Sequence, residues 1–188
     1  MFGTLVTKGQ LIKLVENDKV KITPFDPTRA QPAHYPIDAG IIYRRNGEEW
    51  KPEHDFRSKK EFVFEQSEYC VVEVAQSIVL ASGYAGQFIP SSNLVEQGFS
   101  LVAGKVTYPF GQRGEKIRFG IKNMLTSKNK LKAVDRIAYL QLFDFSALDH
   151  INYELDERDV RVFLQRFHRA DDDGPNYERS DSKSDDLL

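Results

Sequence analysis

The chain has 188 residues, of which 40% are hydrophobic and 29% are charged, and its formal net charge is −2. This length suits one domain with a substantial core, and the composition is that of an ordinary globular protein. No apolar run reaches the length of a membrane span, and Lys8 and Lys13 interrupt the N-terminal apolar residues where a signal peptide would lie. We therefore expect a cytoplasmic protein without a membrane partner.

The N-terminal part predicts one helix. Thr7 is a good N-cap, and Leu11, Leu14 and Val15 recur at helical spacing behind it, so we expect a helix over Lys8–Asn17.

A proline-rich stretch, KITPFDPTRAQPAHYPIDAG at residues 21–40, comes next. Proline fixes φ, and the residue before a proline favours extended geometry, so we expect no helix here. The stretch predicts a strand end that runs into a rigid loop, which is a common place for binding groups.

Short runs of β-branched and aromatic residues make up most of the remaining chain. The Asn46-Gly47 pair after IIYRR is typical of a tight hairpin turn. Many short strands at close spacing predict a mostly β body, built as a barrel or a sandwich. The predicted strands cover residues 20–23, 41–45, 61–65, 69–75, 77–80, 85–89, 99–106, 116–123 and 133–145.

The C-terminal part predicts a helix followed by an acidic tail. A helix over 156–169 would place Val160, Phe163, Leu164 and Phe167 on one face. Residues 1–169 are thus the expected domain, and residues 170–188 the expected disordered tail. Residues 171–188 carry a charge of −5, which leaves only +3 for the rest of the chain, so we expect no nucleic-acid partner. The tail is a candidate contact for a protein partner.

Cysteine and histidine give little support for a metal site. Cys70 is the only cysteine, which excludes a disulfide framework and a cysteine zinc site. The histidines at positions 34, 54, 150 and 168 show no ligand spacing. We expect no resident metal or cofactor.

Four segments occur in an order that is typical of one family. They are VKITPFDPTRAQPAHYPIDAG (20–40), EYCVVEVAQSIVLASGYAGQFIPSSNLVEQG (68–98), VAGKVTYPFGQRGEKIRFGIKN (102–123) and DRIAYLQLFDF (135–145). They resemble the motifs of the dCTP deaminase/dUTPase superfamily, and the deaminase branch more than the dUTPase branch. The resemblance implies a β-clip barrel or sandwich that assembles as a homotrimer, with nucleotide sites between the subunits.

The general base of this family has no counterpart in the chain. The deaminases supply it as a glutamate on a strand that ends in asparagine, and the resemblance places that position at Gly120, before Asn123. Acid–base catalysis is worth about 10²–10⁴ in rate, and glycine cannot supply it. Glu115 is the fallback, but on a straight strand it would face the opposite side. The resemblance therefore implies that catalysis has been lost.

The nucleotide-binding positions of the family have changed as well. Ser91 and Ser92 keep the serines of the phosphate motif, but Glu96 stands in place of its arginine, and a carboxylate repels a triphosphate. In the alternative register, which starts at Ser91, an uncharged valine takes that place. The family's aspartate falls on Thr107, and the glutamine of RIGQL on Tyr139. These positions imply a vestigial site with weak affinity for deoxynucleoside triphosphates.

Three functions stay open from the sequence. We favour a non-catalytic trimer that acts as a scaffold or a regulatory binding protein. The second is an active dCTP deaminase or dUTP pyrophosphatase with shifted residues, whose remaining acids are Glu115, Glu96 and Asp135, and which would take up Mg²⁺ only with its nucleotide. The third is a structural protein of a virus or mobile element, built on the same trimer and located in a virion.

Overall fold

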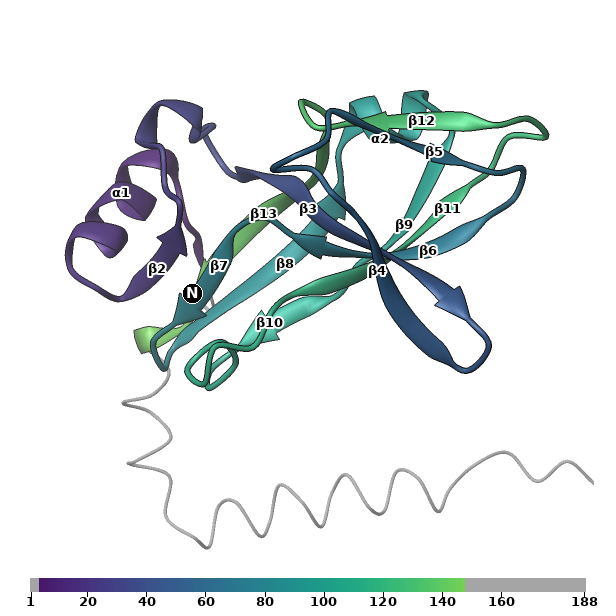
Figure 1. Ribbon diagram of the computed structural model, residues 1–188. Coiled ribbons are helices and arrows are strands. Elements are labelled where there is room, and N and C mark those ends of the chain that lie inside the picture. The colour runs from purple at the N-terminus through teal and green to yellow at the C-terminus, as the bar shows by residue number, and fades with distance from the viewer. Residues whose placement is uncertain (1–3, 148–188) are drawn as a thin grey trace, which may run out of the picture. The chain divides into compact units, whose positions relative to one another are not determined.

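A computed structural model describes residues 4–147 of the chain (Figure 1). The predicted helix over 156–169, the acidic tail and the boundary between them lie outside the described residues. Neither α-helix of the described part is long and apolar enough to cross a membrane. The elements are β1 (Thr4–Leu5), α1 (Lys8–Glu16), β2 (Val20–Thr23), a 3-10 turn (Pro27–Arg29), β3 (Tyr35–Asn46), β4 (Glu49–Asp55), β5 (Glu61–Phe64), β6 (Tyr69–Val74), β7 (Ser77–Leu80), β8 (Tyr84–Pro90), α2 (Ser92–Glu96), β9 (Phe99–Val102), β10 (Lys105–Thr107), β11 (Arg118–Asn123), β12 (Asn129–Lys132) and β13 (Arg136–Asp144).

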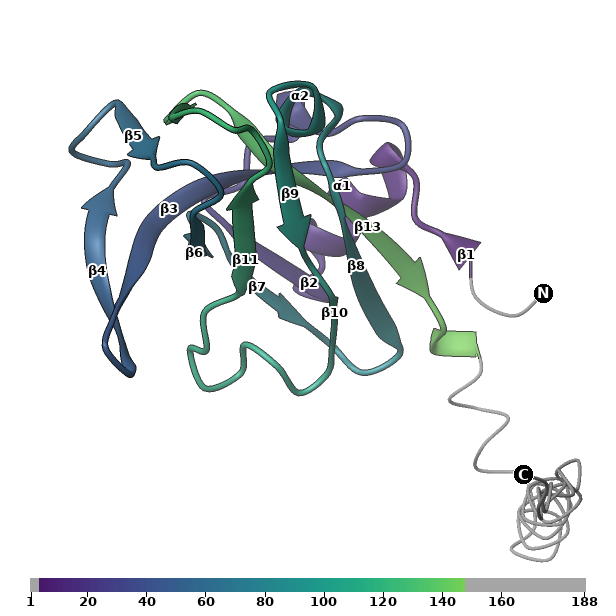
Figure 2. The same ribbon diagram turned by 90° about the vertical axis from the view of Figure 1, so that its right-hand side faces the viewer.

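The main sheet is antiparallel and curls round on itself, as predicted for a mostly β body. Its path runs β10-β8-β13-β3-β6-β11-β9, with β1 beside β13 and β4 beside β3. The strands at the two ends of this path, β9 and β10, are consecutive in the chain and are joined only by Ala103 and Gly104. Figure 2 shows the resulting curvature. Two small sheets, β12-β5 and β2-β7, complete the described part.

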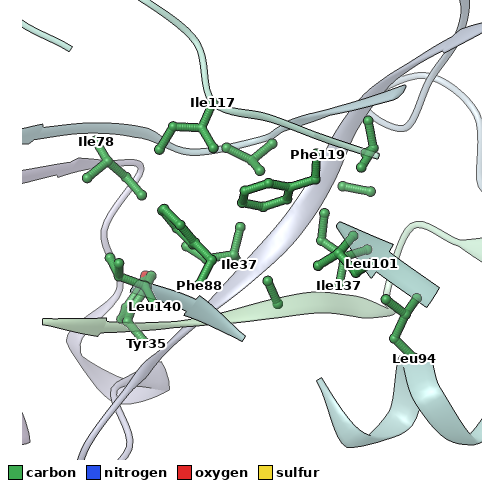
Figure 3. Packing of buried hydrophobic residues seen from close by; sticks show 14 of the residues in the cluster. Tyr35, Ile37, Ile78, Phe88, Leu94, Leu101, Ile117, Phe119, Ile137 and Leu140 are labelled. Carbon is green, nitrogen blue, oxygen red and sulfur yellow. The ribbon is translucent and has the colours of Figure 1, made fainter. Parts of the chain in front are cut away.

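The core fills the inside of this curled sheet, because alternate strand residues point to opposite faces. Phe88 of β8 and Phe119 of β11 meet across it with their ring centroids 5.0 Å apart, and Figure 3 shows them among aliphatic side chains. At one end, Leu94 of α2 is fully buried. Cys70 of β6 is also buried, and burial raises the pKa of its thiol to about 12.

Several local predictions are confirmed. Thr7 caps α1, and its N–H donates to Oε1 of Gln10 at 2.8 Å in a capping box. Strands β2 and β7 have the predicted bounds. The Asn46-Gly47 pair forms the turn between β3 and β4, where Gly47 takes a φ of +64° that most residues avoid.

Other predictions are wrong in part. The strand predicted over 99–106 is two strands, because β9 pairs with β11 whereas β10 pairs with β8. The proline-rich stretch contains a 3-10 turn, Pro27–Arg29, which Asp26 caps by accepting a hydrogen bond from the Thr28 N–H at 2.9 Å. The rigid loop ends earlier than predicted, since β3 already begins at Tyr35.

Candidate functional site

Gly120 lies on the outer face of the sheet and is covered by a side chain from the neighbouring strand. It pairs with Val71 of β6 and with Val102 of β9. A Cβ atom on Gly120 would lie 2.1 Å from the Tyr69 hydroxyl oxygen and 2.7 Å from its Cζ. Diagonal neighbours on one sheet face are within reach of a long side chain. The phenol of Tyr69 therefore occupies the space that a side chain at position 120 would need.

A carboxylate on the same face, Glu73, is already engaged. Glu73 accepts hydrogen bonds from the Tyr43 hydroxyl at 3.0 Å and from Nη2 of Arg118 at 2.9 Å. The Arg118 guanidinium lies 4.3 Å from the centroid of the Tyr43 ring. Burial, and then the hydrogen bond to Glu73, raise the pKa of Tyr43. Glu73 thus holds a cation and a phenol, and is not a free base.

Glu115 lies in the loop between β10 and β11 rather than on a strand. Its Oε2 accepts hydrogen bonds from the backbone N–H groups of Gly111 at 3.1 Å and Arg113 at 3.0 Å. Hydrogen bonds from the backbone, first of all its own N–H, lower the pKa of Glu115. A lowered pKa makes a carboxylate a weaker general base. The contacts of Glu115 are those of a residue that shapes its own loop.

The predicted phosphate motif forms the short helix α2. Ser91 is fully buried, and its Oγ accepts a hydrogen bond from the Leu94 N–H at 3.2 Å and donates to the Arg136 carbonyl. Ser92 and Glu96 are exposed. Ser91 is therefore already used as a helix cap that joins α2 to β13, whereas Ser92 and Glu96 face solvent.

Asp135, the third remaining acid, contacts the other end of α2, at Gln97. It is buried, and it accepts hydrogen bonds from the Lys132 N–H at 2.8 Å and from Nε2 of Gln97 at 3.2 Å. Its hydrogen bonds join the turn before β13 to the end of α2, so these contacts are structural.

Ser91→Ala is expected to lower the free energy of unfolding by about 1–2 kcal/mol, because it removes an N-cap. Urea denaturation at fixed protein concentration measures this. Ser92→Ala is the matched control, since Ser92 is adjacent and exposed, and it should change stability by less than about 0.5 kcal/mol. Equal effects of the two substitutions would contradict the capping role of Ser91.

Thr107 lies apart from this motif. Thr107 pairs with Ala85 at the start of β8, whereas Ser91 follows the other end of that strand. It lines a groove of about 850 Å³ along β8, to which Phe143, Phe145 and Tyr108 also contribute. One chain therefore does not bring Thr107 and the phosphate motif together.

Tyr139 contacts the end of the proline-rich stretch, at His34 and Pro36. Tyr139 pairs with Pro36 across β13 and β3, and its ring centroid lies 4.2 Å from that of His34. Burial, and secondly the charge of Arg136, lower the pKa of His34. A lowered pKa keeps the imidazole neutral, which suits a packing contact better than the binding of a phosphate.

The aromatic and charged residues that surround Gly120 were not among the predicted site residues. Trp50 of β4 lies near Tyr69, with ring centroids 6.0 Å apart. The signal that could have found them is the period of two along β6 and β11, which places Tyr69, Glu73 and Arg118 on the face of Gly120. Within residues 4–147 there is no group of three histidine, cysteine or acidic residues that could hold a metal ion.

Comparison with known proteins decides the fold. No protein-family model matches the chain, and no curated protein matches it. The solved structure of 2′-deoxycytidine 5′-triphosphate deaminase from Agrobacterium tumefaciens matches with a TM-score of 0.61 and 14% identity, over 77% of this chain and 49% of that one. The fold is that of dCTP deaminase. The predicted dUTPase-like β-clip is thereby confirmed.

Two dUTPase structures show weaker likeness to this dCTP deaminase-like fold. A mutant dUTPase from phage phi11 of S. aureus has a TM-score of 0.45 and 12% identity, over 66% of this chain and 90% of that one. EIAV dUTPase has a TM-score of 0.40 and 14% identity, over 58% and 87%. The chain spans about half the length of the deaminase that it matches.

Proposed function

We propose that this protein is a non-catalytic dCTP deaminase-like homotrimer that serves as a scaffold or a regulatory binding protein. The observation that carries the proposal is the pair of Gly120 and Tyr69. The resemblance places the general base at position 120, where glycine has no titratable side chain. The phenol of Tyr69 fills the space beside it. A carboxylate at this position would need both a substitution of Gly120 and a rotation of the Tyr69 side chain.

The surroundings of the vestigial positions support the same conclusion. The Glu115 carboxylate is bound by backbone N–H groups of its own loop, and Ser91 is bound as a helix cap. Glu96 presents a negative charge where the family has a cation for phosphate. The apolar core that forms the fold is nevertheless complete, with Phe88 and Phe119 in contact at its centre. Selection on assembly or binding, without selection on turnover, accounts for this combination.

Purified protein is expected to show no deamination of dCTP and no hydrolysis of dUTP, with or without Mg²⁺. The reason is the missing general base at Gly120. Product formation measured by chromatography checks this, and light scattering on the same sample should give the mass of a trimer. A turnover that Glu115→Gln abolishes and the exposed-site control Glu48→Gln retains would contradict the proposal, and a stable monomer would contradict the assembly.

Glu96→Arg is expected not to create micromolar binding of dCTP or dUTP. Reversing this charge removes a repulsion, but triphosphate recognition needs several aligned donors together, and Ser91 is already bound within the chain. Calorimetry on the wild type, Glu96→Arg and the charge-matched control Glu48→Arg measures this. Micromolar binding by the wild type would show that the pocket is intact, and binding gained by Glu96→Arg alone would show a site lost at one residue.

A further inference from the structure

The outer face around Gly120 extends across five neighbouring strands. Figure 2 shows β4, β3, β6, β11 and β9 following one another from left to right. Residues that pair directly across an antiparallel sheet lie on the same face. The pairs Arg45–Trp50, Lys122–Tyr69 and Arg118–Glu73 therefore share one face with Gly120 and Val102. We call this surface the outer platform.

Aromatic rings are exposed on the outer platform. The side chains of Trp50 and Tyr69 are large apolar groups that remain 38% and 45% exposed. Their ring centroids lie 6.0 Å apart at an interplanar angle of 66°. Val102, on the last strand of the platform, is 65% exposed. Neighbouring exposed rings on a sheet face are a surface on which planar ligands can stack.

The charge of the outer platform is positive. Its carboxylate on β6, Glu73, is neutralised by Arg118 at 2.9 Å. Arg45 and Lys122 are exposed, and neither forms an ion pair within residues 4–147. Arg45 donates from Nε only to the Gly47 carbonyl, at 3.0 Å. Within residues 4–147, two cations therefore border the rings without a protein anion to neutralise them.

We infer that the outer platform binds single-stranded nucleic acid. Bases would stack on Trp50 and Tyr69, while Arg45 and Lys122 would contact phosphates on either side of the rings. Aromatic stacking combined with a cationic track is the physical basis of binding single strands without sequence preference. A duplex keeps its bases stacked internally and cannot offer them to the rings. From the small net charge of residues 1–170 we expected no nucleic-acid partner. That expectation failed to anticipate the outer platform, because a sum over the chain does not reveal one cationic face.

This inference rests on the proposed binding role and names its partner. Trp50 is the chain's only tryptophan, so its fluorescence reports directly on the outer platform. Titration of the full-length protein with twelve-nucleotide oligo-dT and oligo-rU at about 50 mM salt should quench this fluorescence with a saturable curve. The observed affinity should fall as salt rises, with a logarithmic slope of about −0.7 for each phosphate neutralised in a single strand.

Tyr69→Ala should weaken binding at least about tenfold, as expected for loss of a stacking ring, while Tyr69→Phe should retain it. Lys122→Gln should reduce the salt slope by about 0.7. Tyr108→Ala is the matched aromatic control, since Tyr108 is 53% exposed in the groove along β8, and Lys13→Gln on α1 is the charge control. Both controls should bind like the wild type, and circular dichroism should show every variant folded.

Three results would overturn the inference. The first is absence of quenching up to about 100 μM oligonucleotide, well above typical non-specific affinities at low salt. The second is equal affinity for duplex, which would mean that charge alone is responsible. The third is a smaller mass of Tyr69→Ala in light scattering, which would make the outer platform a contact between subunits. None of these depends on nucleotide turnover, so an active enzyme would overturn the proposed function and leave this result unaffected.

Discussion

Phe64→Ala is expected to lower the free energy of unfolding by about 3–5 kcal/mol, the usual loss for a buried phenylalanine. Phe64 of β5 has no exposed surface. Its ring packs edge-to-face against Phe62 at 4.9 Å and against Phe99 at 5.0 Å between centroids. The Phe62 and Phe99 rings are held on different strands and cannot both move into the space that the substitution leaves, so a cavity would remain. Urea denaturation at fixed protein concentration measures the change.

Val63→Ala is the control for that substitution. Val63 is the neighbouring residue on the opposite face of β5 and is 37% exposed. Its loss should cost less than about 1 kcal/mol, since it removes a partly solvated methyl pair. If Phe64→Ala and Val63→Ala destabilised the protein equally, the aromatic cluster would not be the packed element described above.

Gly111→Ala is expected to destabilise the protein by about 2–5 kcal/mol, as the sum of left-handed strain and overpacking. Gly111 has a φ of +85°. A Cβ atom there would lie 2.2 Å from the carbonyl oxygen of Ile78. That oxygen belongs to the backbone of β7 and cannot rotate away as a side chain would. The loop that holds Glu115 would have to separate from β7, and thermal unfolding should show a lower midpoint.

Gly114→Ala separates the two causes. Gly114 lies in the same loop with a φ of +81°, but a Cβ atom there would meet nothing within 4 Å. It should cost only the backbone strain, about 1–2 kcal/mol. The difference between the two variants then measures the contact with Ile78. Equal losses would show that the loop moves freely away from β7.

Elements that carry a signal in their own sequence, such as the helix cap of α1, could be predicted from the sequence. Thr7 caps α1 because its side chain and Gln10 satisfy backbone groups within a few residues. Strand β4 was missed, because Glu49–Asp55 is a largely exposed strand whose residues do not alternate between apolar and polar. Helix α2 was missed because the apolar contact that stabilises it, made by the buried Leu94, is a property of the tertiary structure.

In the candidate site, too, some features could be predicted from the sequence and others depend on the tertiary structure. Counting along the motif is enough to find that glycine stands where the resemblance places a carboxylate. Tyr69 covers Gly120 because of the register between β6 and β11, in which Gly120 pairs with Val71. These two strands are distant in the chain, and their register cannot be read from the sequence of either one. The roles of Ser91 and Glu115 likewise depend on where the loop and helix backbones place their N–H groups.

Strand β4 has a consequence for the behaviour of the protein at high concentration. Within the described residues it pairs with β3 alone, so its other side is an open edge of the main sheet. Pro52 lies in the middle of this edge between Lys51 and Glu53, and proline has no N–H to donate to an incoming strand. Charged residues and proline on an edge strand hinder the addition of further strands. A protein this rich in phenylalanine and tyrosine is thereby protected against fibril growth from β4, while the face of the sheet stays accessible.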